Sequence, residues 1–252
     1  MSGASQPKPR LLNALGSALA LPEAEVPRAL RLLSLVFLTS AALAVLKAVQ
    51  GGVFLAAYGR EAIPRAFGAS ALCLAAASSL SAAMAPRLGP SRLASAGLGI
   101  SAAALLVLRL ALFVDAPGAP FLVYVVIETI CGIALIQVWS VVSETIDPRS
   151  AKRLLPVAGV GGSLAWTTFG LLVPRLVALV GAAGLLFIAP LLLLAALSIV
   201  RAIATIDLAG KPGRASKRVG LFASWKQGLG FVLEVPLMRI AMILSVLALL
   251  GE

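Results

Sequence analysis

Six long apolar stretches, each sufficient to cross a lipid bilayer, run through this 252-residue chain. A helix needs about 20 mainly apolar residues to span a hydrocarbon core roughly 30 Å thick. Only helices and closed barrels satisfy their backbone groups in lipid, and these stretches lack the alternating pattern of a strand. The sequence therefore predicts an all-α, polytopic transmembrane helix bundle. The six expected spans are residues 30–58, 66–84, 93–114, 121–142, 154–180 and 182–203.

The composition excludes most other classes of protein. The chain is 60% hydrophobic and 12% charged, with a mean hydropathy of +1.04, which is far from the composition of soluble domains. The net charge of +11 does not indicate nucleic-acid binding, because the basic residues lie between the spans. The chain has no His, and Cys73 and Cys131 both fall inside spans, so we expect no metal site and no cofactor. No set of nucleophile, base and acid indicates an enzyme.

The distribution of Lys and Arg predicts the orientation in the membrane. About 14 of them lie in the N-terminal segment and the even-numbered loops, against two, Arg60 and Arg65, on the other side. Cytoplasmic loops carry the excess of basic residues, so we expect the N-terminus and the even-numbered loops in the cytoplasm.

Four regions follow from this pattern. Residues 1–29 form a cytoplasmic segment, residues 30–204 the six-helix bundle, and residues 205–236 a basic cytoplasmic linker with an amphipathic helix at 221–233. Residues 237–252 begin a seventh span. Six spans, a basic loop and a new span are typical of transporters built from two six-helix halves. We therefore expect a missing partner, either a second six-helix half or an attached cytoplasmic domain.

The segment 137–163 carries a recognisable motif. It combines Trp139, the sequence Asp147-Pro-Arg, the triplet Ala-Lys-Arg153 and a glycine-rich continuation at 159–163. This motif resembles a signature of the ATP/ADP antiporter-type nucleotide transporters, and still more that of their bacterial relatives in the major facilitator superfamily. The resemblance implies a facilitator-type six-helix half, in which the first and fourth spans line a central cavity.

Two positions depart from the patterns of these families. Pro86 stands where the facilitator loop between the second and third spans has an Asp, although Arg87, Gly89 and Arg92 fit that loop. In the family this carboxylate joins a charge network that stabilises one access state, so tight gating is in doubt. Gln50 stands where nucleotide antiporters carry a Lys, so strict ATP/ADP exchange is not expected.

Lys47 and Glu128 are charged residues deep within the expected first and fourth spans. Both lie about 25–27 Å from the cytoplasmic ends of their spans, at 1.5 Å per residue, and therefore share a depth. Charged residues at such depth are functional candidates. The pair has three open roles, which are anion binding by Lys47, proton transfer by Glu128 and locking of an empty cavity. The alternative is that both side chains snorkel to the outer interface.

Other candidate residues fall into two sets, each with an alternative. Gln137 and Trp139 either join Lys47 and Glu128 in binding substrate or pack within the bundle. The charged residues at the cytoplasmic mouth either form a gate or are merely solvated. This gate set is Arg87, Arg92, Glu144, Asp147, Arg149, Lys152 and Arg153.

Two glycine-rich segments allow different interpretations. Gly51 and Gly52 either break the first span beside Lys47 or permit close packing. The run at 159–163 follows a loop rather than a strand, so it indicates close helix contact instead of a phosphate-binding loop.

We expect a secondary transporter that moves a small organic anion, such as a nucleotide or phosphorylated metabolite, by alternating access. The alternative is a membrane module without transport, which anchors a cytoplasmic domain or serves as its sensor. The lipid bilayer is the expected partner in both cases.

Overall fold

The computed structural model describes residues 22, 25–114, 116 and 118–207, and in this part of the chain it contains six long helices and no strand. Each helix is long and apolar enough to cross a membrane. The chain is therefore a multi-pass membrane protein, and the expected all-α bundle is confirmed. The helices are α2 (Val26–Tyr58), α3 (Ile63–Leu88), α4 (Pro90–Phe113), α5 (Ala119–Thr145), α6 (Pro148–Val180) and α7 (Leu185–Asp207).

Proline marks the start of five of these helices. The helices α2 to α6 each carry Pro at the first or second position, as Pro27, Pro64, Pro90, Pro120 and Pro148. The first helical N–H groups have no partner within the helix, and proline has no N–H and a fixed φ that suits this position. The sequence thereby sets five of the helix starts locally.

The helices extend beyond the apolar stretches, which corrects two expected loops. Arg149, Lys152 and Arg153 lie within the first two turns of α6 rather than in a loop, because Pro148 starts that helix six residues before the apolar run. The expected loop 85–92 is a turn at Gly89, between the end of α3 and the start of α4. Gly89 has a φ of 73°, a conformation that glycine adopts without strain.

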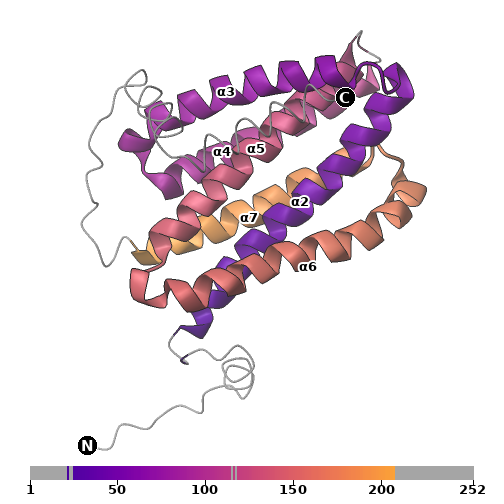
Figure 1. The fold of residues 1–252 in the computed structure, drawn as a ribbon. Helices are drawn as coiled ribbons and strands as arrows, with labels where there is room; N and C mark the ends of the chain where they lie inside the picture. Colours follow the sequence, from indigo (N-terminus) through magenta and orange to yellow (C-terminus); the bar gives the residue numbers. More distant parts are fainter. Residues whose placement is uncertain (1–21, 23–24, 115, 117, 208–252) are drawn as a thin grey trace, which may run out of the picture.

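The helix α2 is the centre of the bundle. It packs against α5, α6 and α7, while α4 packs against α5 and α7. In the most apolar window of each helix, 67% of the α2 residues are buried, against 6% for α3 and 11% for α6. Figure 1 shows α3 and α6 on opposite sides of the other four helices. Their outer faces carry exposed apolar side chains, as contact with lipid requires.

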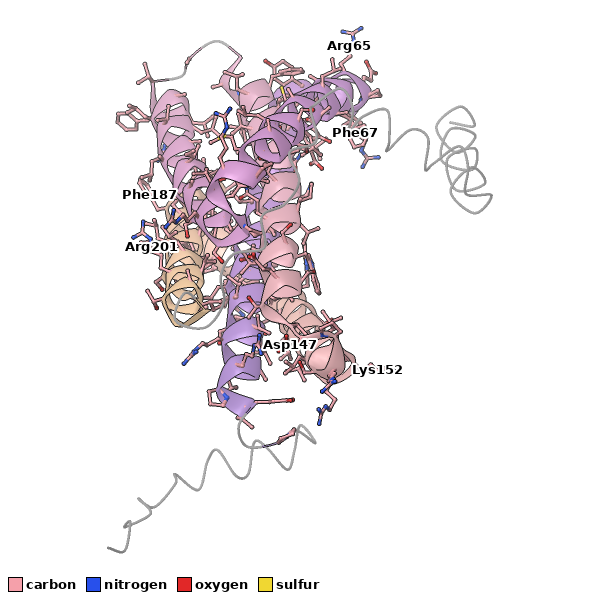
Figure 2. All side chains as sticks on the ribbon, turned by 90° about the vertical axis from the view of Figure 1, so that its left-hand side faces the viewer. Arg65, Phe67, Asp147, Lys152, Phe187 and Arg201 are labelled. Carbon is pink, nitrogen blue, oxygen red and sulfur yellow. The ribbon has the colours of Figure 1, made fainter. Side chains whose placement is uncertain are left out.

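Successive helices run in opposite directions, so the bundle has two ends (Figure 1). We call them the Val26 end, where α2, α4 and α6 begin, and the Tyr58 end, where these helices finish. Figure 2 shows Asp147 and Lys152 at the Val26 end and Arg65 and Phe67 at the Tyr58 end.

Close contact between α2 and α6 confirms the packing role of the glycine run at 159–163. A Cβ atom added to Gly161 would lie 2.5 Å from the backbone oxygen of Leu33, so only glycine permits this approach. Gly51 and Gly52 do not break the first span, because α2 continues through them to Tyr58. The added Cβ atom of Gly52 would contact Ala182 at 3.5 Å, so this position takes part in ordinary packing.

Three expected features lie outside the described residues. They are most of the N-terminal segment 1–29, the linker helix at 221–233 and the seventh span at 237–252. Of the N-terminal segment, residues 26–29 belong to α2.

Candidate functional site

Lys47 of α2 and Glu128 of α5 form an ion pair inside the bundle, nearer its Tyr58 end than its Val26 end. The Nζ atom of Lys47 donates a hydrogen bond to Oε2 of Glu128. Lys47 lies 11 residues before Tyr58, and Glu128 lies nine residues after Ala119. These separations correspond to about 16 and 14 Å along the helices, or about half of a hydrocarbon core. The pairing expected from their shared depth is confirmed, and the charges meet each other rather than snorkelling apart.

Gln50 is the third member of this cluster. Its side chain is only 4% exposed, and its Nε2 atom donates to Oε2 of Glu128 at 2.7 Å. The same atom lies 3.4 Å from the backbone oxygen of Tyr124, one turn before Glu128. A single carboxylate oxygen thus accepts hydrogen bonds from an ammonium group and an amide. We call Lys47, Gln50 and Glu128 the central polar cluster.

The central polar cluster is incompletely covered by the bundle. The side chain of Lys47 is 39% exposed and that of Glu128 is 25% exposed, whereas Gln50 is buried. An isolated charge at the centre of a membrane helix costs about 2.5–3.5 kcal/mol on insertion scales. Mutual pairing offsets much of this cost, because removing either partner leaves a charge in a medium of low dielectric constant. The ammonium group of Lys47 has three donors, and the Glu128 oxygen accepts from one of them.

Aromatic rings cover the cluster toward the Tyr58 end. Phe54 is fully buried, and its ring centroid lies 4.7 Å from that of Tyr124 and 5.5 Å from that of Tyr58. Phe121 completes the group, at 6.4 Å from Phe54 and 6.3 Å from Tyr58. Rings at these separations attract one another and exclude water. They bind the end of α2 to the start of α5 immediately beyond the central polar cluster.

Gln137 and Trp139, the other two expected substrate-binding residues, lie elsewhere on α5. Gln137 is nine residues from Glu128, which at about 100° per residue places it on the opposite face of the helix. It is 5% exposed and packs on Gly97 of α4, where an added Cβ atom would lie 2.0 Å from its Oε1 atom. Trp139 is 11 residues from Glu128, on nearly the same face, and packs partly buried against the core three turns nearer the Val26 end. The structure brings neither residue into the central polar cluster.

Two ion pairs connect the starts of α2 and α6 at the Val26 end. Arg28 Nη1 lies 3.8 Å from Asp147 Oδ2, and Arg153 Nη2 lies 3.5 Å from Glu25 Oε1. These residues border a pocket of about 510 Å³, whose other lining residues are Pro148, Arg149 and Ser150. Three arginines and two carboxylates therefore line this pocket, which has an excess of positive charge.

The remaining residues of the expected gate set also lie at the Val26 end but outside this pocket. Arg87 and Arg92 are exposed on either side of the turn at Gly89. Glu144 is exposed near the end of α5, and Lys152 is exposed in α6. The structure thus brings Asp147, Arg149 and Arg153 together and leaves the other four residues at separate positions around the same end.

Three residues of these sites were absent from the expected sets. Gln50 lies one turn from Lys47 on the same helix face, a spacing that places both side chains beside the same partner. Glu25 and Arg28 precede and begin α2, and their partners Arg153 and Asp147 have opposite charges. Charge complementarity between helix starts is the signal that could have indicated them.

Comparisons of the chain with protein-family models, with curated proteins and with solved structures find no match.

Proposed function

We propose that this membrane protein is a secondary transporter that moves a small organic anion by alternating access, with Lys47 as the group that binds the anion. The observation that supports this proposal best is the charge of Lys47, whose side chain is 39% exposed and lies about 16 Å along α2 from the Tyr58 end. A charge at this depth is costly, and binding of a substrate is a common reason for retaining it.

The surroundings of Lys47 favour an oxyanion as the ligand. The ammonium group offers donors to a carboxylate or phosphate oxygen, and the Gln50 amide lies beside it as a further donor. Arg28, Arg149 and Arg153 at the Val26 end would raise the local concentration of anions near the entrance. The resemblance of segment 137–163 to nucleotide transporters makes a nucleotide or another phosphorylated metabolite the first class to test.

The proposed location is a bacterial inner membrane with the Val26 end in the cytoplasm. The basic residues at this end support this orientation, because Arg28, Arg87, Arg92, Arg149 and Arg153 all lie there. At the Tyr58 end, the turn between α2 and α3 carries Arg60, with Arg65 following in the first turn of α3.

A membrane anchor or sensor without transport is the second candidate. It is favoured by the way the central polar cluster satisfies its own charges, since Glu128 accepts hydrogen bonds from both Lys47 and Gln50. In this function the cluster would be a static link between α2 and α5. In a transporter, Lys47 would release Glu128 and bind a solute in its place. In an anchor or sensor, Lys47 would stay paired with Glu128.

Counterflow in proteoliposomes tests the proposal directly. Vesicles loaded with one of a panel of nucleotides, sugar phosphates and carboxylates are diluted into the same labelled compound. The proposal predicts label entry for at least one anion, loss of that entry in Lys47→Ala, and retention in Arg175→Ala. Arg175 is an exposed cation of α6 and is the matched control for loss of a positive charge. If no panel member enters with the wild-type protein, or if Lys47→Ala transports normally, the anchor function is favoured.

A further inference from the structure

Oε2 of Glu128 occupies the position that an anion would need at Lys47. Lys47 and Gln50 both direct their donors at this one atom, so the best site for an incoming oxyanion is already filled by the protein's own carboxylate. An anion that approaches Lys47 while Glu128 is ionised meets a like charge at contact distance. It must also displace a charge-assisted hydrogen bond.

Protonation of Glu128 removes both obstacles. The carboxylate takes up one proton on an oxygen and becomes a neutral acid, while the Lys47 ammonium keeps its charge. The ion pair then becomes a free cation beside a neutral group, and the donors of Lys47 and Gln50 become available to another oxyanion. The net charge of the site changes from zero to +1, which is the charge that a monoanion neutralises.

We propose that Glu128 couples anion binding to proton binding, so that the site takes up one proton with each anion and the transporter is a proton–anion symporter. This inference rests on the proposed function and specifies its coupling ion. When the site binds an ionised monoanion together with one proton, its net charge is zero. The empty site, in which Lys47 pairs with the ionised Glu128, has the same net charge. For a monoanion such as lactate, both states that must cross the membrane barrier therefore have zero net charge, which avoids the cost of moving a net charge through hydrocarbon.

No other ionisable group of the described residues is placed to perform this exchange. From α2, Lys47 is the charged group that faces Glu128, and Tyr58 lies about three turns from Lys47 in the aromatic group. Tyr124 and Cys131 of α5 flank Glu128 closely enough to interact with it electrostatically, but both are neutral groups at physiological pH.

The other two helices that pack against α5 supply no competing acid. The ionisable residues of α4 are Arg92 and Arg109, and neither is an acid. Arg92 lies at the Val26 end, and the guanidinium group of Arg109 lies 5.3 Å from the ring centroid of Phe187 of α7. In α3, the ionisable residues are Arg65 and Arg87, near its two ends, and the exposed Cys73. Glu128 is the carboxyl group in the described spans that contacts Lys47.

Calorimetric titration of the purified full chain with ADP, lactate and sulfate tests this coupling. Each titration is run in two buffers of different ionisation enthalpy, which yields the number of protons taken up per anion bound. Lactate and sulfate keep a fixed charge across the neutral range, and the protons that ADP itself exchanges are subtracted using Glu128→Gln. The wild-type protein should take up one proton per anion from solutions in which Glu128 is ionised.

The pH dependence of the affinity gives a second readout. Above the pH at which Glu128 loses its proton, wild-type affinity should fall about tenfold per pH unit, because one proton is linked to each binding event. The Glu128→Gln variant should bind the fixed-charge anions with an affinity that no longer depends on pH.

Three results would contradict the proposal in distinguishable ways. Binding by the wild-type protein without proton uptake would overturn the coupling and leave the anion site standing. Proton uptake that persists in Glu128→Gln for lactate or sulfate would assign the proton to another group and also overturn it. Failure of all three anions to bind would overturn the anion site itself, and the coupling with it.

Discussion

The substitution Gly161→Ala tests the contact between α2 and α6 on which the arrangement of the bundle depends. The new Cβ atom would lie 2.5 Å from the Leu33 backbone oxygen and 3.3 Å from the Phe37 backbone nitrogen. Ordinary contact begins near 3.4 Å, so α6 must move away from α2 by roughly 0.9 Å. No side-chain rotation can relieve the clash, because both obstructing atoms belong to the backbone of α2. Overpacking of this kind costs about 1–3 kcal/mol.

The matched control is Gly159→Ala in the same helix, where an added Cβ atom has no neighbour within 4 Å. This control carries the same gain in helix propensity without the clash. Fluorescence-detected size-exclusion chromatography after heating gives the apparent Tm of both variants. We expect Gly161→Ala to melt about 2–12 °C below Gly159→Ala, from about 2–4 °C per kcal/mol for a chain of this size. Equal Tm values would refute the close packing of α6 on α2.

Three further outcomes are expected. In a cysteine-free background, an impermeant maleimide added outside cells should label Glu61→Cys and spare Lys152→Cys, and the reverse pattern would contradict the orientation. Gln137→Met should raise the stability by about 1 kcal/mol, because the buried Oε1 atom of Gln137 has no hydrogen-bond partner, and a lower Tm would show that this atom is satisfied. Phe54→Ala should lower the stability by about 2–3 kcal/mol, because it removes the ring contacts of a fully buried side chain. Phe67→Ala should change the Tm little, because the Phe67 side chain is half exposed.

The apolar stretches predicted the fold because the bilayer imposes a single length scale on them. All six expected spans correspond to helices, and the differences lie at the ends. The start of α6 was placed too late because hydropathy reports where lipid begins, whereas Pro148 determines where the helix begins. In the same way, a proline and a glycine shortened the expected loop at 85–92 to the turn at Gly89.

The pairing of Lys47 with Glu128 was predictable from their shared depth together with the resemblance that places the first and fourth spans around one cavity. The participation of Gln50 depends on how α2 is rotated against α5, and only its spacing of one turn from Lys47 indicates it in the sequence. The position of Gln137 shows a different limit. Helical periodicity places Gln137 on the face of α5 opposite Glu128, whereas Trp139 lies on nearly the same face as Glu128. Membership of one sequence motif therefore does not place Gln137 and Trp139 in one site.

In the proposed transport cycle, Lys47 and Glu128 act as one functional unit. The most direct measurement is the initial rate of uptake into proteoliposomes driven by a pH gradient, compared for the wild-type protein, Lys47→Ala, Glu128→Gln and the double variant. The anion is one that gave counterflow with the wild-type protein. Insertion and folding of each variant are checked by size-exclusion chromatography.

Each single substitution is expected to lower the rate at least about tenfold, which corresponds to about 1.4 kcal/mol. The double variant should be no slower than the slower single variant, because residues in direct contact are not additive. Wild-type rates in both single variants, or a double variant whose loss is the product of the two single losses, would contradict the claim.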